Sequence, residues 1–181
     1  MNQQVSAHVT PLIEGFDRRV QATPTDRWAH PSPCERWTAK DVVDHVISNF
    51  VGICNGLGAG DSSPQDSEDI VSRWNAARDR FLRAVETADL STQLPGPMGP
   101  MSAIDVIGRL IATDVLVHTW DLARAVGGDE QLDEEAVRFA YSALAPLDQM
   151  IRVAGVFGPR IDVGDDADLQ TQFLSFLGRK V

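Results

Sequence analysis

Apolar side chains recur with the period of an α-helix in four long stretches of the chain. The third stretch has the clearest pattern, in which large apolar residues mark one face at Ile70, Trp74, Ala77, Phe81 and Val85. The four stretches cover residues 3–22, 38–55, 67–88 and 102–126. They predict a bundle of four helices, with no β-sheet larger than a minor hairpin. Two shorter stretches, from Asp133 to about Met150 and from Asp168 to Leu177, predict additional C-terminal helices.

Local signals indicate where these helices begin and end. Side chains that can cap a helix stand at the start of three of the stretches: Thr38, Asp66 or Ser67, and Ser102. Asp41 and Asp105 lie three residues beyond the first and the last of these caps, in the reciprocal position of a capping box. Gly127-Gly128 is expected to stop the fourth helix, and Pro146 is expected to kink the helix that follows it or to split off its last turn.

The fourth stretch carries a polar group on a face that should be buried. On a regular helix, Asp114, His118 and Asp121 fall within one narrow arc. Apolar residues share that arc: Ile107, Leu110, Ile111, Val117 and Ala125. Because burying unpaired charge is expensive, the two carboxylates and the imidazole need partners. A metal ion gripped by His and Asp at i and i+4 would satisfy them, and so would a hydrogen-bonded Asp–His pair in the core.

Two further residues could carry chemistry. His45 lies at the edge of the apolar stripe of the second helix, where a histidine bonded to a backbone or side-chain acceptor is the favoured interpretation. Cys34 lies in a loop with Trp28 and Trp37 that we expect to pack onto the bundle. A reactive thiolate needs an electropositive setting that the sequence does not show, so Cys34 is interpreted as structural.

Composition excludes several classes of protein. The chain has 181 residues, of which 43% are hydrophobic, and this suits one globular domain. A formal net charge of -10 argues against binding to nucleic acid and against docking on an anionic membrane. No apolar run approaches the ~18 residues of a membrane span, and we expect no signal peptide. Because the two cysteines are too few for a disulfide framework, the expected location is cytoplasmic.

The fourth helix is apolar almost all round. Leu116, Trp120 and Ala123 lie on the opposite side of it from Asp114 and His118. A helix with apolar residues on every side is buried on every side. Either the C-terminal elements or a second copy of the chain must cover this face, and we expect a homodimer.

Two motifs, taken in order, resemble those of a known family. The first is Trp-Thr-Ala-Lys-Asp-Val-Val-Asp-His, which ends at His45, and the second is Asp-Val-Leu-Val-His-Thr-Trp-Asp-Leu-Ala, which begins at Asp114. The chain resembles the DinB/YfiT-like superfamily of metal-dependent four-helix bundles. Within it, the chain is most similar to the actinobacterial branch that shares the metal-binding domain of mycothiol-dependent maleylpyruvate isomerase. The resemblance covers essentially all of residues 1–181 and implies a single all-α domain, a DinB/YfiT-like four-helix bundle with additional C-terminal helices.

The resemblance also implies a divalent metal ion held by His45, Asp114 and His118. The isomerase pattern has Glu where this chain has Asp114, so Asp121 is expected either to replace it as a ligand or to hydrogen-bond a ligand imidazole. Two imidazoles and one carboxylate leave positions open on Zn²⁺, and the same set suits Ni²⁺ or Fe²⁺. No general base can be identified in the sequence, so no catalytic residue is assigned.

These features predict a metal-dependent S-transferase. The metal ion would activate a small-molecule thiol, mycothiol or another low-molecular-weight thiol, for attack on an electrophile. Two alternatives remain: a non-catalytic metal-binding protein related to stress, and a metal-dependent hydrolase with water in the same open position. The fold cannot decide among these three hypotheses, because one fold hosts many functions. The S-transferase alone would consume an electrophile in a reaction that needs both the metal ion and the thiol.

Overall fold

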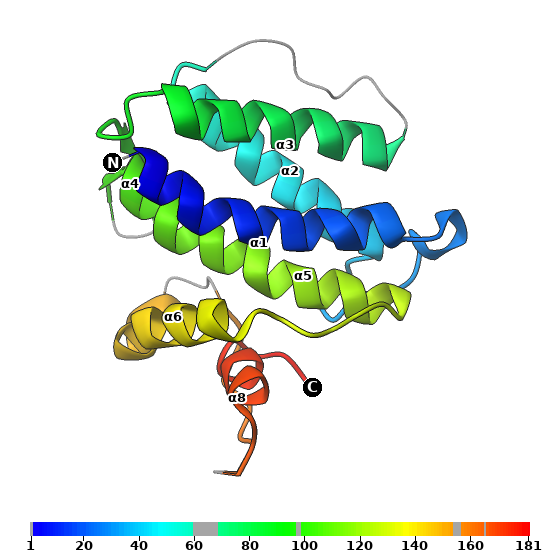
Figure 1. Ribbon diagram of the computed structural model, residues 1–181. Helices are drawn as coiled ribbons and strands as arrows, with labels where there is room; N and C mark the ends of the chain where they lie inside the picture. The colour runs from blue at the N-terminus through cyan, green and yellow to red at the C-terminus, as the bar shows by residue number, and fades with distance from the viewer. Residues whose placement is uncertain (1, 60–68, 97–98, 154–156, 165) are drawn as a thin grey trace. The chain divides into compact units, whose positions relative to one another are not determined.

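The computed structural model describes residues 2–59, 69–96, 99–153, 157–164 and 166–181. Helices make up most of these residues (Figure 1). The sheet in the described ranges is an antiparallel pair of two-residue strands, β1 (Gln93–Leu94) and β2 (Met101–Ser102). The all-α class is therefore confirmed for the described part of the chain. None of the described helices is long and apolar enough to cross a membrane.

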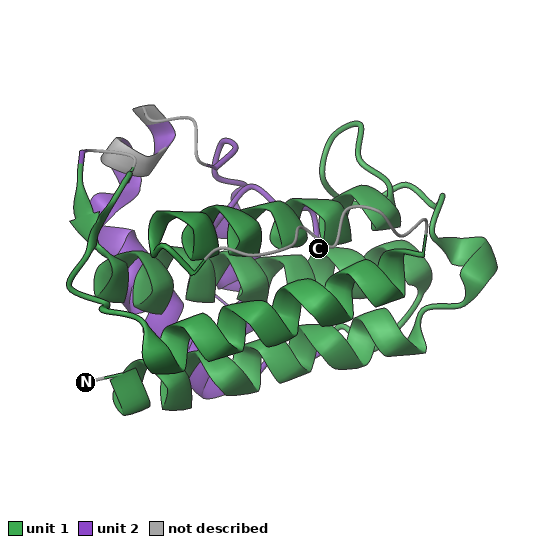
Figure 2. Cartoon of the chain, turned by 90° about the horizontal axis from the view of Figure 1, so that it is seen from above, with its two compact units in different colours: residues 1–96, 100–130 green, residues 97–99, 131–181 purple. Residues whose placement is uncertain are grey.

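The chain divides into two compact units, which Figure 2 distinguishes by colour. The first unit consists of Met1–Gly96 and Pro100–Glu130, and the second of Pro97–Gly99 and Gln131–Val181. The long helices of the first unit are α1 (Asn2–Ala22), α2 (Ala39–Gly56), α3 (Ile70–Thr87) and α5 (Ala112–Val126). α1 and α2 each pack against both α3 and α5, as the four-helix bundle predicted from the sequence requires (Figure 1).

The second unit holds the C-terminal elements. They are α6 (Glu134–Leu144), the 3-10 turn η4 (Ala145–Leu147), α7 (Asp148–Val153) and α8 (Leu169–Phe176). α6 packs on α8 through Tyr141, whose ring centroid lies 5.3 Å from that of Phe176. Pro146 lies in η4, so the helix predicted from Asp133 to Met150 is split at its proline, as expected.

An aromatic cluster fixes α2 against its neighbours. The Phe50 ring of α2 stacks on Phe81 of α3 with a centroid separation of 4.0 Å. Phe16 of α1 meets Trp74 of α3 edge to face, with centroids 4.9 Å apart. All four side chains are fully buried, and the Trp74 indole N–H donates to Asp17 Oδ1 at 2.7 Å. This packing holds the helix that carries His45 in one position.

Most of the predicted helix ends are present. Ser102 accepts a hydrogen bond from the Asp105 backbone N–H, and Gly127 ends α5 with a φ of 70°, where a residue with a Cβ would be strained. The third helix begins later than predicted, at Ile70. Its cap is Asp69, and the expected caps at positions 66 and 67 lie outside the described residues.

The fourth helix differs from the single regular helix that the sequence predicted. Between α4 (Ala103–Asp105) and α5, the segment η3 (Val106–Ile111) is a π-helix. A π-turn contains more residues than an α-turn, so it rotates the residues before it relative to those after it. Leu110, which a regular helix places on the buried arc, is only half-buried. The three polar residues of the predicted arc, Asp114, His118 and Asp121, all follow the π segment, so they still share one face of α5.

Replacing Thr38 with alanine should lower the free energy of unfolding by about 1 kcal/mol. Its hydroxyl accepts from the Asp41 backbone N–H at 3.3 Å, and the Asp41 carboxylate accepts from the Thr38 N–H at 2.8 Å. Ser48→Ala is the control, because that hydroxyl bonds only the Asp44 carbonyl one turn back in α2, and the change should stay under about 0.5 kcal/mol. Urea unfolding measures both variants, and equal losses would contradict the capping role.

Candidate metal centre

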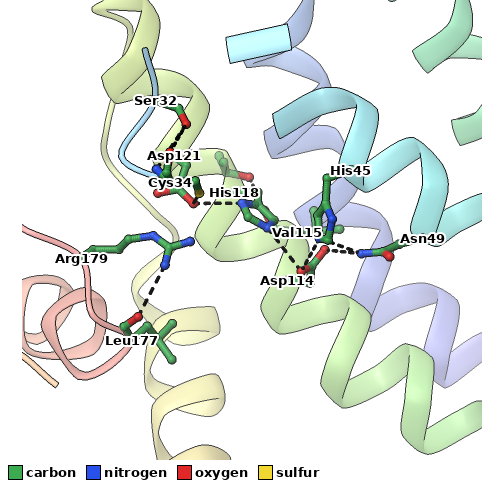
Figure 3. Close-up of polar contacts among 11 residues, drawn as sticks. Ser32, Cys34, His45, Asn49, Asp114, Val115, His118, Asp121, Leu177 and Arg179 are labelled. Atoms are coloured by element: carbon green, nitrogen blue, oxygen red, sulfur yellow. Dashed lines mark hydrogen bonds and ion pairs between the residues drawn. The ribbon is translucent and has the colours of Figure 1, made fainter. Parts of the chain in front are cut away.

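His45 of α2 and two residues of α5, Asp114 and His118, converge between these neighbouring helices (Figure 3). Asp114 Oδ1 lies 3.2 Å from His45 Nε2 and 3.4 Å from His118 Nε2. One potential ligand atom from each residue lies within 4.8 Å of the other two. The structure thus brings together the three residues that the sequence analysis chose, and their role as metal ligands stays a prediction.

Asn49 completes this group, and the sequence analysis gave it no role. Its side-chain amide donates to Asp114 Oδ2 at 3.0 Å and lies 3.0 Å from His45 Nε2. The bond to Oδ2 orients the carboxylate so that Oδ1 faces both histidines. The available signal was its spacing, because Asn49 follows His45 by four residues on the same helix.

Asp121 lies on the other side of the His118 ring. His118 Nδ1 is 2.9 Å from Asp121 Oδ2, and the Asp121 side chain is fully buried. A carboxylate that accepts the Nδ1 hydrogen leaves the Nε2 atom facing Asp114. Of the two expectations for Asp121, this geometry corresponds to the hydrogen-bond partner of an imidazole rather than to a substitute for Asp114.

The loop before α2 adds two residues to the site. The Cys34 thiol donates to Asp121 Oδ2 at 3.3 Å, and the Trp37 ring lies 5.0 Å from the His45 ring and 5.9 Å from the His118 ring. The loop therefore packs against the bundle, as expected. Its contacts with the two histidines and with Asp121 were not predicted, because they join residues far apart in the sequence.

The charges in this cluster are strongly coupled. Burial alone would raise the pKa of Asp114, but the positive charge and hydrogen bond of His118, together with His45, hold that pKa well below its usual value of 3.8. Burial alone would lower the pKa of His118, but Asp114 and hydrogen bonds with Asp121 and Cys34 raise it well above 6.5. Without a metal ion, this coupling favours the imidazolium form of His118 between the two carboxylates.

The group is open to solvent on one side. The His45 and Asp114 side chains are 32% and 25% exposed, whereas His118 is 7% exposed. Two imidazole nitrogens and one carboxylate oxygen form the donor set of zinc sites that leave a position open for a substrate. The residues present therefore suit a divalent ion that a small molecule can reach from the His45 side.

Comparison with known proteins gives the family. Residues 9–55 and 55–123 match the model of the mycothiol maleylpyruvate isomerase N-terminal domain. Two relatives from Mycobacterium tuberculosis are the uncharacterized protein MT0763 of strain CDC 1551 and the uncharacterized protein Rv0738 of strain H37Rv. Each is 29% identical over 160 residues, which cover 86% of this chain and 87% of the relative.

No solved structure matches the chain. The segments matched by the family model contain the whole candidate centre, including the loop residues Cys34 and Trp37. The match confirms the resemblance inferred from the two sequence motifs. The chain belongs to the mycothiol maleylpyruvate isomerase N-terminal domain family.

Proposed function

We propose that the protein is a metal-dependent thiol S-transferase. His45, Asp114 and His118 hold a divalent ion, with zinc as the first choice and nickel or iron as alternatives. Mycothiol or another low-molecular-weight thiol is the cosubstrate, and a small electrophile receives its sulfur. The observation that carries the proposal is the convergence of two imidazoles and a carboxylate, from α2 and α5, on a side open to solvent.

The surrounding residues prepare the three donors for this role. Asn49 binds the second oxygen of Asp114, so the first oxygen stays directed at the histidines. Asp121 accepts the Nδ1 hydrogen of His118, so the Nε2 atom of that ring is the one available to an ion. Because the donors are held in advance, little rearrangement is needed when the ion binds.

A divalent ion in this position would deprotonate a coordinated thiol at neutral pH. The chain's own contribution is access and shielding. The partly exposed side of His45 and Asp114 admits the small molecules. The half-buried Trp37 ring, whose centroid lies 5.0 Å from that of His45 and 5.9 Å from that of His118, would limit the access of water on its side of the group.

The test has two measurements on the full chain, purified without chelator and without nickel affinity resin. The first is metal content by mass spectrometry. The second is consumption of the generic electrophile 1-chloro-2,4-dinitrobenzene with mycothiol, with and without added Zn²⁺. We expect bound metal and consumption that requires both thiol and metal.

Asp114→Asn should abolish the metal-dependent consumption and lower the metal content, since it removes the anionic donor while keeping the side-chain shape. Asp79→Asn is the matched control, because Asp79 is an exposed carboxylate of α3 that pairs with Arg78. Bound metal without consumption would overturn the transferase in favour of a binding protein. Consumption of an ester that needs metal but no thiol would overturn it in favour of a hydrolase.

The expected homodimer is a separate prediction. Leu116, Trp120 and Ala123, the apolar residues that motivated it, are all buried. The prediction therefore rests on the family resemblance. Light scattering at micromolar concentration should give twice the chain mass of 19.8 kDa, and a monomer mass would contradict it.

A further inference from the structure

We propose that Cys34, Asp121 and the Nδ1 atom of His118 form a second metal-ion site, which takes a soft ion such as Cd²⁺, Zn²⁺ or Cu⁺. The three residues each offer one ligand atom, and these atoms all lie within 4.8 Å of one another (Figure 3). Asp121 Oδ2 is central, at 3.3 Å from Cys34 Sγ and 2.9 Å from His118 Nδ1. A thiolate, an imidazole and a carboxylate are the ligand types of zinc sites in proteins.

The spacing of the donors is close to that of a bound ion. In a tetrahedral site with bonds of about 2.0–2.3 Å, neighbouring donor atoms stand roughly 3.3–3.8 Å apart. The two observed separations are 2.9 and 3.3 Å. Small shifts of these side chains would therefore admit an ion. When the ion binds, the Cys34 Sγ hydrogen and the His118 Nδ1 hydrogen leave for solvent as protons.

The loop presents Cys34 in a fixed position. Its backbone N–H donates to Ser32 Oγ at 3.2 Å, and its carbonyl accepts from the Trp37 N–H at 3.0 Å. The Ser32 N–H donates to the Trp37 carbonyl at 2.8 Å, which closes the loop. Arg36 has a φ of 66°, an unfavourable conformation that a non-glycine residue adopts only where the surroundings impose it. The sulfur is thus held toward α5 before any ion arrives.

The second site is chemically distinct from the first. The two nitrogens of one imidazole point in different directions, so His118 offers Nε2 to the first group and Nδ1 to the second. The first group contains no sulfur, whereas the second contains Cys34. Because sulfur ligands favour soft ions, the second group should select them. The two sites share His118, and the second forms only when Nδ1 has given up the hydrogen that it otherwise donates to Asp121. It uses neither His45 nor Asp114, so it does not depend on the proposed transfer reaction.

The test is titration of the metal-free, fully reduced chain with Cd²⁺, followed by the thiolate-to-cadmium charge-transfer absorption in the ultraviolet. The parent should develop this absorption at stoichiometric Cd²⁺. Cys34→Ser should weaken Cd²⁺ binding by at least about tenfold and lose the absorption. Asp121→Asn should weaken the binding while keeping the sulfur. Circular dichroism checks that each variant is folded.

Two controls isolate the site. Cys54→Ser should leave the absorption unchanged, since burial raises the pKa of the Cys54 thiol and so disfavours its thiolate. Asp114→Asn should keep the absorption while it abolishes metal-dependent thiol transfer, so the two proposals can fail separately. Absence of the band in the folded parent, or its persistence in Cys34→Ser, would overturn the second site and leave Cys34 as a hydrogen-bond donor to Asp121.

Discussion

Replacing His118 with alanine should abolish the rise in melting temperature that Zn²⁺ or Ni²⁺ causes in the parent protein. A ligand that binds only the folded state stabilises it by about 2.7 kcal/mol when its concentration is 100 times its dissociation constant. For a chain of this size, that corresponds to a rise of roughly 5–10 °C. The variant retains His45 and Asp114 but lacks one of the three converging donors. Differential scanning calorimetry with and without metal measures the effect.

The comparison uses the metal-induced rise and not the melting temperature itself, because truncating a buried side chain also destabilises the metal-free protein. His30→Ala is the matched control, since His30 belongs to neither group of candidate ligands. It should keep the full rise. If His118→Ala showed the same rise as the parent, the Asp114–His118 contact would be a hydrogen-bonded pair of the core, and the metal assignment would be wrong.

The parts of the fold that depend on near neighbours in the sequence could be predicted. The apolar period in residues 70–85 gave α3, and the capping pairs at Thr38 and Ser102 gave the starts of α2 and of the fourth helix. These signals are local, because a cap or a helical face involves residues within a few turns of one another. Asp114 and His118 belong to the same class, since their i, i+4 spacing alone places them on one face.

The parts that depend on distant neighbours could not be predicted. Cys34 meets Asp121 across 87 positions of sequence, and Asn49 meets Asp114 across 65. No local pattern reports such a contact. His45 was joined to α5 only through the family resemblance, because its own helix favoured an ordinary hydrogen-bonded histidine.

The π segment before α5 has a different origin. The apolar period of a helix runs through residues 106–111, and Gly108 is the one weak helix former among them, so the period alone did not predict the wider turn. π segments are frequent at functional sites. Here the segment ends at Ile111, three residues before Asp114, on the helix that packs against α2.

The metal-free protein should lose stability at both ends of the pH range. Folding lowers the pKa of Asp114, so its contribution is present above about pH 4 and is lost as the pH falls through the lowered pKa. Folding raises the pKa of His118, so its contribution is complete below about pH 6.5 and is lost as the pH rises through the raised pKa. Urea unfolding at several pH values should give a maximum between these limits.

Metal affinity should change with pH in a way that follows from the charge of His118. Because an ion needs the lone pair of Nε2, the imidazolium must give up a proton before it can bind. Below the raised pKa of His118, each pH unit should therefore strengthen Zn²⁺ binding up to about tenfold. Calorimetric titration between about pH 6 and pH 8, in non-coordinating buffers, measures the affinity.

The same titrations should show the proton directly. About one proton should leave His118 for each ion bound, so the apparent enthalpy should depend on the ionisation enthalpy of the buffer. The metal-induced rise in melting temperature should also grow with pH, since binding strengthens over the range in which the His118 ion pairs weaken. An affinity that stays flat from about pH 6 to pH 8, without proton release, would mean that His118 is neutral between Asp114 and Asp121 before the ion binds.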